Sequence, residues 1–89
     1  MEKDEVYSKE NVAKRLKWLR ETTGLTQSAF ADSINVTPTV YNNWETGRQR
    51  LSLEGALSLN KVYGTTLDFL FLARRGDLPP ELIKSLPNS

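Results

Sequence analysis

Apolar side chains recur along the first third of the chain at the spacing of an α-helix. Val12, Leu16 and Leu19 fall at positions i, i+4 and i+7, which lie on one face of a helix with 3.6 residues per turn. Gly24 follows at the place where helices commonly end in a left-handed residue. The pattern predicts an amphipathic helix over about residues 9–23.

Two shorter apolar patterns come next, with a turn between them. Thr26 is a good N-cap, and Phe30 and Ile34 share one helical face behind it. Asn35 tolerates the left-handed backbone that a tight turn needs. Pro38 suits the first position of a helix, where its missing N–H leaves no hydrogen bond unmade. We therefore predict two short helices joined by a turn, over about residues 26–34 and 37–46.

The remaining pattern is helical too. Ser52 is suited to cap a fourth helix that Gly64 ends, and Thr66 to cap a short fifth helix as far as about Leu72. No internal repeat and no convincing strand pattern appears. The prediction is an all-α fold of five helices, with three segments: a flexible N-terminal tail (1–8), a helical domain (9–73) and a C-terminal extension (74–89).

Composition excludes several classes of function. The chain has 89 residues, enough for one domain, and contains neither Cys nor His. Disulfides, thiolate or imidazole catalysis and Cys/His metal sites are therefore excluded, and we expect no enzyme, metal, cofactor or small-molecule effector. No apolar stretch approaches the ~20 residues that cross a bilayer, and the charged N-terminus is unlike a signal peptide. The expectation is a cytoplasmic protein without a membrane partner.

Charge is unevenly distributed along the chain. The net charge is only +1, but residues 11–75 hold nine basic and five acidic side chains, a net +4. The two ends hold three basic and six acidic side chains, a net −3. A basic middle is compatible with a nucleic-acid surface, although an ordinary solvated surface would give the same pattern.

The run LTQSAFADSINVTPTVYNNWETGRQRLSL resembles the lambda-type repressors, Cro proteins and their bacterial relatives, the Xre family. The residues that carry the resemblance are Leu25, Thr26, Gln27, Phe30, Ala31, Ile34, Asn35, Val36, Thr37, Tyr41, Asn43, Trp44, Glu45 and Gly47. The resemblance covers about residues 12–72. It implies a compact lambda repressor-like helix-turn-helix domain in which the helix over 37–46 enters the major groove of double-stranded DNA.

The resemblance also implies roles for individual residues. Pro38, Thr39, Asn42 and Asn43 are expected to face the bases, since an Asn amide offers the donor and acceptor that an adenine edge requires. Phosphate contacts are expected from Thr26, Gln27, Arg48 and Arg50. Arg20 and Glu45 are expected to form a structural ion pair between the first helix and the end of the third. Lys14, Arg15 and Lys17 are equally compatible with phosphate contacts and with a solvated face.

A homodimer on an inverted-repeat operator is expected, because one helix-turn-helix reads few base pairs. The candidate dimer interface is the apolar C-terminal part of the chain, with Phe69, Leu72, Leu78, Leu82 and Leu86. The alternative is that this part packs onto its own chain.

The sequence is compatible with two functional interpretations. The first is a sequence-specific transcriptional regulator, most readily a repressor. The second is an antitoxin or adaptor-type protein-binding module, with or without autoregulatory DNA binding. The outward face of the third helix distinguishes them, since polar side chains there favour DNA and apolar ones favour protein.

Overall fold

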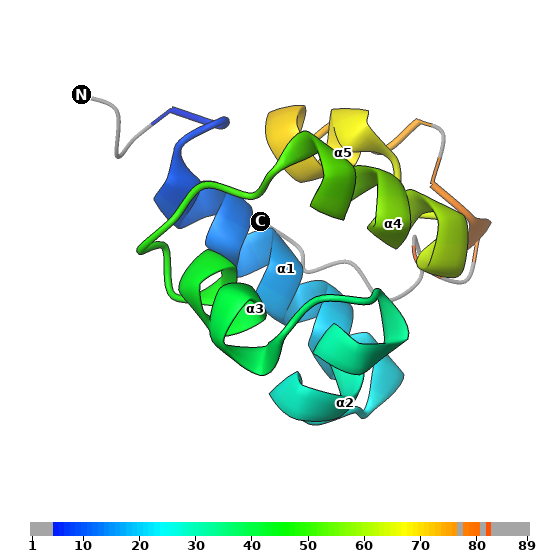
Figure 1. Cartoon of the computed structure of the whole chain (residues 1–89). Coiled ribbons are helices and arrows are strands. Elements are labelled where there is room, and N and C mark those ends of the chain that lie inside the picture. The colour runs from blue at the N-terminus through cyan, green and yellow to red at the C-terminus, as the bar shows by residue number, and fades with distance from the viewer. Residues whose placement is uncertain (1–4, 77, 81, 83–89) are drawn as a thin grey trace.

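The chain folds as a bundle of helices around one core. The computed structural model describes residues 5–76, 78–80 and 82. The element order is α1 (Lys9–Thr23), α2 (Gln27–Ser33), α3 (Pro38–Glu45), α4 (Leu53–Tyr63) and α5 (Leu67–Leu72) (Figure 1). The described residues form no strand, so the all-α, five-helix prediction is confirmed. Within the same residues, the helices are too short or too polar to span a bilayer.

Local side-chain chemistry sets the helix boundaries. Every helix is preceded by a Ser or Thr whose hydroxyl oxygen accepts a hydrogen bond from a backbone N–H in the first turn: Ser8, Thr26, Thr37, Ser52 and Thr66. Gly24 and Gly64 end α1 and α4 with φ of 74°, in the left-handed region. Asn35 adopts φ of 60° in the turn between α2 and α3, as its residue type predicts.

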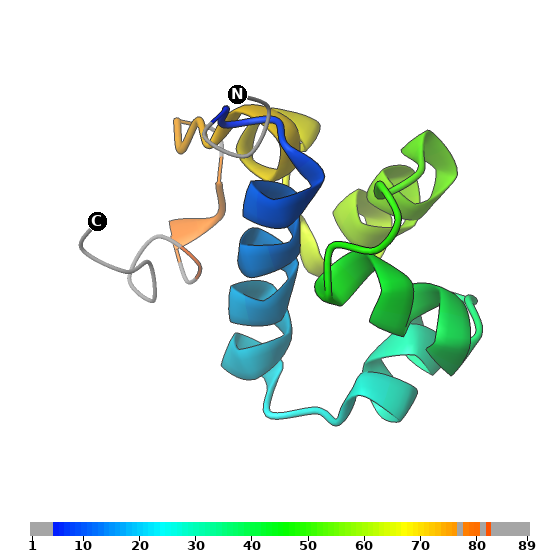
Figure 2. The same ribbon diagram turned by 90° about the vertical axis from the view of Figure 1, so that its left-hand side faces the viewer.

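The core forms where α1 meets the other helices, and Figure 2 shows α1 running through the middle of the domain. Leu16 and Leu19 of α1 are fully buried, as are Phe30 of α2 and Tyr41 of α3. The Phe30 ring stacks on Tyr63 with a centroid distance of 4.9 Å, so α4 closes over α2. The Phe30 ring also meets Tyr41 of α3 with a centroid distance of 5.1 Å, so one ring joins α2 to both α3 and α4.

Within the described residues, much of the apolar C-terminal part packs onto the chain's own core, as the alternative to the predicted dimer interface has it. Phe69 and Leu78 are each only 4% exposed, and the ring of Phe69 meets Trp18 edge-on at 5.3 Å. Leu82 is partly buried against the same core. They cover the side of α1 that α3 leaves open, and sequence could not show that this side needed covering. Leu72 is 39% exposed, and Leu86 lies outside the described residues.

Part of the segment predicted as a flexible tail is bonded to the domain. Ser8 is fully buried as the cap of α1, and Asn11 Nδ2 donates to the carbonyl of Glu5 at 2.7 Å. Arg50 Nη1 donates to the carbonyl of Tyr7 at 2.6 Å. Residues 5–8 thus lie against the loop that follows α3, while residues 1–4 lie outside the described part.

Candidate nucleic-acid interface

The pair α2 and α3 is joined by a short turn whose geometry is fixed by hydrogen bonds. The N–H of Asn35 donates to the carbonyl of Asp32 at 3.1 Å, and that of Val36 to Ala31 at 3.0 Å. Ile34 is buried and Val36 is partly buried against the core. The turn is therefore anchored on its apolar side, and α3 leaves it in one defined direction.

α3 has a sharply divided surface. Tyr41 and Trp44 are buried, whereas Pro38, Thr39 and Val40 are exposed. Asn43 lies one turn beyond Thr39 and is half-buried at the edge of the same outward face. Figure 2 shows residues 78–80 on the opposite side of α1 from α3, so the described C-terminal part leaves this face open.

A chain of hydrogen bonds, which we call the polar relay, crosses from α1 through α3 to α2. Arg20 donates to both carboxylate oxygens of Glu45, from Nε to Oε2 at 2.9 Å and from Nη2 to Oε1 at 3.0 Å. Gln27 Nε2 donates to Glu45 Oε1 at 3.1 Å. Asn42 Nδ2 donates in turn to Gln27 Oε1 at 3.0 Å. The relay fixes the C-terminal end of α3 to both preceding helices.

These hydrogen bonds stabilise the charged forms of Glu45 and Arg20. Burial alone would raise the pKa of Glu45, but hydrogen bonds from Arg20, Tyr41 and Gln27 outweigh it and hold the pKa below its ordinary value. The hydrogen bond to Glu45 raises the pKa of Arg20. Burial, first of all, raises the pKa of the neighbouring Tyr41 phenol. The ion pair is therefore charged throughout the neutral range.

Asn42 and Asn43 are adjacent in sequence but lie in different surroundings. Asn42 belongs to the relay, and its Oδ1 accepts from Arg48 Nη1 at 3.3 Å. Asn43 points to the loop after α3 instead: its Nδ2 donates to Gln49 Oε1 at 3.3 Å. Its Oδ1 accepts from Arg48 Nη1 at 3.5 Å. Each amide thus has both of its ends bonded and one N–H of Nδ2 beyond those bonds, but Asn42 is held to α2 whereas Asn43 is held to the loop after α3.

The cations expected at phosphates are positioned differently from one another. Arg48 is exposed next to the α3 amides, and Arg50 is exposed but donates to the carbonyl of Tyr7. The sequence left Arg15 between a phosphate contact and a solvated face. In the structure Arg15 donates to the carbonyl of Leu70 at 2.9 Å, and burial lowers its pKa. That contact satisfies a carbonyl at the end of α5, which identifies Arg15 as structural. Lys14 and Lys17 are exposed on α1.

Gln27 and Thr26 stand where α2 begins. The Thr26 hydroxyl caps the helix by accepting from the N–H of Ala29 at 3.1 Å. The Gln27 side chain is half-buried and turns toward the relay. Of the two N–H groups of the Gln27 amide, one donates to Glu45 and the other is not used in that bond.

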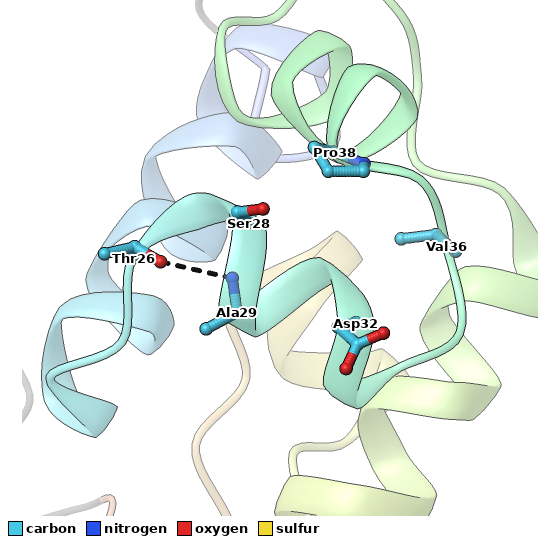
Figure 3. A pocket seen from close by; sticks show the side chains of 6 residues that line it. All are labelled: Thr26, Ser28, Ala29, Asp32, Val36 and Pro38. Atoms are coloured by element: carbon cyan, nitrogen blue, oxygen red, sulfur yellow. Dashed lines mark hydrogen bonds between the residues drawn. The ribbon is translucent and has the colours of Figure 1, made fainter.

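A shallow hollow of about 450 Å³ lies between α2 and the start of α3, and Figure 3 shows it from close by. Its lining residues are Thr26, Ser28, Ala29, Asp32, Val36 and Pro38. The carboxylate of Asp32 occupies one end of the hollow and disfavours an anion there (Figure 3). A phosphate near α2 is therefore better placed at the Thr26 end, away from Asp32.

No role for Gln49 was predicted from the sequence. This residue contacts Asn43 through its side chain and through its N–H, which donates to the Asn43 carbonyl at 3.0 Å. Gly47, with φ of 79°, turns the chain back so that residue 49 reaches α3. Gly47 was the available signal, since a left-handed residue after a helix returns the chain toward the last turn.

The comparisons with known proteins bear on the same segment. A protein family described as helix-turn-helix matches residues 16–70 of the 89, a span that contains α2, the turn and α3. No curated protein and no solved structure matches the chain.

Proposed function

Because the chain belongs to the helix-turn-helix family of lambda repressor-like (Xre) proteins, we propose that it is a sequence-specific transcriptional regulator, in the first place a repressor. In this proposal α3 enters the major groove of double-stranded DNA and α2 lies across the phosphate backbone. The protein acts in the cytoplasm, without catalysis and without a small-molecule effector.

The observation that carries the proposal is the outward face of α3. Thr39 is exposed and Asn43 stands at the edge of the same face, while Tyr41 and Trp44 anchor the opposite face in the core. A hydroxyl and an amide on a rigidly held helix suit the donor and acceptor pattern of base edges. The exposed Pro38 and Val40 make this face partly apolar, but the hydroxyl of Thr39 and the amide of Asn43 favour DNA over the protein partner of an antitoxin-like module.

Within this proposal the predicted site residues take separate roles. Thr39 and Asn43 read base edges, and Pro38 contributes an apolar contact near the start of the helix. Asn42 is expected to read a base edge as well, and its bonds to Gln27 and Arg48 also hold α3 against α2.

Phosphate contacts are assigned to the residues that flank α3. Thr26 and the remaining N–H of Gln27 lie on the α2 side, and Arg48 and Arg50 lie in the loop beyond α3. Arg50 Nη1 also donates to the carbonyl of Tyr7, which holds this guanidinium beside the start of α1.

The test is selection of bound sequences from a random pool of duplex DNA at a stated salt concentration. We expect an enriched inverted repeat, bound by two copies of the chain. Asn43→Ala should reduce discrimination at one position of each half-site about tenfold, since a good amide–base pair contributes about 1–3 kcal/mol. Arg50→Ala should weaken binding evenly across sequences and reduce its salt dependence.

Arg74→Ala provides the matched control, because Arg74 is exposed after α5, away from α3. This variant should leave both affinity and base preference unchanged. If the pool yields no enriched sequence at low salt, or if Asn43→Ala selects the wild-type sequence with unchanged discrimination, the proposed function is wrong.

A further inference from the structure

The hydrogen bonds that link Arg48 to the polar relay all run in one direction, toward Glu45. Arg48 Nη1 donates to Asn42 Oδ1, and Asn42 Nδ2 donates to Gln27 Oε1. Gln27 Nε2 in turn donates to Glu45 Oε1. The two ends have fixed chemistry, because a guanidinium can only donate and an ionised carboxylate can only accept. The orientation of each amide between them therefore depends on the orientation of the other.

Turning either amide end for end would create repulsive contacts at both of its neighbours. A turned Gln27 would place oxygen against oxygen at Glu45 and nitrogen against nitrogen at Asn42, across distances of 3.1 and 3.0 Å. A turned Asn42 would do the same at Gln27 and at Arg48. Since half-buried polar groups without a partner are costly, only one orientation of the two amides satisfies all three bonds.

The neighbouring amide of Asn43 is held less strictly. Its Nδ2 donates to Gln49 Oε1, and Gln49 is exposed. Because Gln49 itself carries an amide, which can donate or accept, the two side chains can turn together and keep a hydrogen bond between them. They would give up only the 3.5 Å contact between Arg48 Nη1 and Asn43 Oδ1. The difference between the two asparagines is thus the carboxylate behind Gln27.

This carboxylate lies too deep to meet DNA itself. The side chain of Glu45 is only 4% exposed, and it also accepts two hydrogen bonds from Arg20. Any effect of Glu45 on base recognition must therefore pass through the amides that it orients.

We propose that Glu45 determines the base preference of Asn42 by fixing the direction of its amide, which makes Glu45 a positioning residue of the recognition surface. The inference rests on the proposed function, in which Asn42 faces a base edge. Adenine presents an acceptor, N7, beside a donor, the N6 amino group, so an amide pairs with both in only one of its two orientations. Asn42 accepts one order of donor and acceptor in the groove, whereas Asn43 can adapt to either order.

The first test compares base preferences in selections from a random pool of duplex DNA. Glu45→Gln keeps the size of the side chain but replaces one acceptor oxygen with a donor, so Gln27 and Asn42 are no longer held in one orientation. We expect discrimination to fall about tenfold at one position of each half-site, through the loss of one good amide–base pair. This should be the position that Asn42→Ala also relaxes, while the position that Asn43→Ala relaxes keeps its preference.

Gly55→Ala is the matched control for a loss of stability alone. An added Cβ there presses on Trp44, on the other side of the end of α3, and leaves the polar atoms of the relay unchanged. It should lower the affinity for preferred and other sequences by the same factor. Helicity and urea denaturation show that each variant is folded under the conditions of the selection. Glu45→Gln with wild-type preferences, or with an even loss at every position, would overturn the proposal.

The second test needs no DNA. Nuclear magnetic resonance measures how fast the side-chain amide protons exchange with solvent. Asn42 and Asn43 are both half-buried, so burial alone predicts similar rates. We expect the Asn42 protons to exchange severalfold more slowly, because this amide cannot turn without losing its bonds, and Glu45→Gln to remove most of the difference. Equal rates for the two amides in the wild-type chain would show that Glu45 does not hold Asn42.

The two proposals fail separately. A wild-type chain that selects no DNA sequence contradicts the proposed function, and the exchange rates still decide whether Glu45 orients Asn42. A wild-type chain that selects a sequence, but whose preferences Glu45→Gln leaves unchanged, keeps the proposed function and removes the role of Glu45.

Discussion

Trp44 and Glu45 are neighbours at the end of α3, yet they attach that helix to the domain in different ways. Glu45 accepts hydrogen bonds from Arg20 of α1 and Gln27 of α2. Trp44 faces the other way and packs its six-membered ring against Gly55 of α4. One attachment is polar and directional, while the other depends on the shapes of two surfaces.

The difference matters because both attachments set the angle at which α3 is presented. Hydrogen bonds to a carboxylate specify orientation and depend on its ionisation. Apolar packing has no such dependence, but tolerates almost no change in volume. The presentation of the recognition helix is thus sensitive to charge on one side and to volume on the other, and each can be broken separately.

Removing the polar attachment should have the largest effect. Glu45→Ala leaves the Arg20 guanidinium, only 18% exposed, without its carboxylate, and leaves Gln27 without an acceptor. We expect a loss of about 3 kcal/mol in the free energy of unfolding, the lower end of the range for breaking a buried ion pair. Urea denaturation measures it. Glu21→Ala, an exposed acid on α1, should change stability by less than about 0.5 kcal/mol. Equal losses for the two variants would show that the ion pair stabilises the fold no more than an exposed carboxylate does.

Breaking the apolar attachment should have the next largest effect. A Cβ on Gly55 would lie 2.5 Å from Trp44 Cη2 and 3.1 Å from Leu51 Cδ1. Gly55→Ala should therefore destabilise by about 1–2 kcal/mol, although Ala favours a helix more than Gly does.

Two variants make the interpretation of Gly55→Ala specific. Gly76→Ala, where an added Cβ meets nothing within 4 Å, should be nearly neutral. Trp44→Phe combined with Gly55→Ala should lose less than the two single losses added together, because the smaller ring makes room. If the double variant loses as much stability as the two single variants together, the contact with Trp44 is not what makes a larger residue unfavourable at position 55.

The helices and their caps could be predicted from sequence because their causes are local. Thr26, Thr37 and Thr66 cap through atoms three residues away, and Gly24 and Gly64 end helices by their own backbone freedom. The outward position of Thr39 follows from the buried position of Tyr41 in the same helix. The pairing of Arg20 with Glu45 was available only through the resemblance to a family, since the two residues are 25 apart in sequence.

What sequence could not give depends on contacts between distant segments. Nothing in the dipeptide Asn42–Asn43 shows that one amide joins the relay while the other meets Gln49. Arg15 appeared equivalent to its lysine neighbours until the end of α5 was placed beside it. Phe69 appeared to be surplus apolar surface because its contact, Trp18, lies on the side of α1 away from α3.

The smallest expected effect distinguishes the two attachments by pH. The folded state holds the pKa of Glu45 below its ordinary value of 4.5, so between these two values the unfolded chain binds more protons than the folded chain. The stability from Glu45 is therefore fully present above pH 4.5 and is lost as the pH falls through the folded pKa. Urea denaturation from pH 7 to pH 3 should show a steeper loss for the wild type than for Glu45→Gln, which cannot titrate.

The Gly55→Ala variant controls for the apolar side. Because its defect is steric, its stability should lie below that of the wild type by a constant amount at every pH. Other carboxylates titrate in all three proteins and cancel in the differences between them. If the wild-type and Glu45→Gln profiles run parallel below pH 4.5, the carboxylate gains no net stabilisation from Arg20, Tyr41 and Gln27. The orientation of α3 would then depend on the Trp44 contact alone.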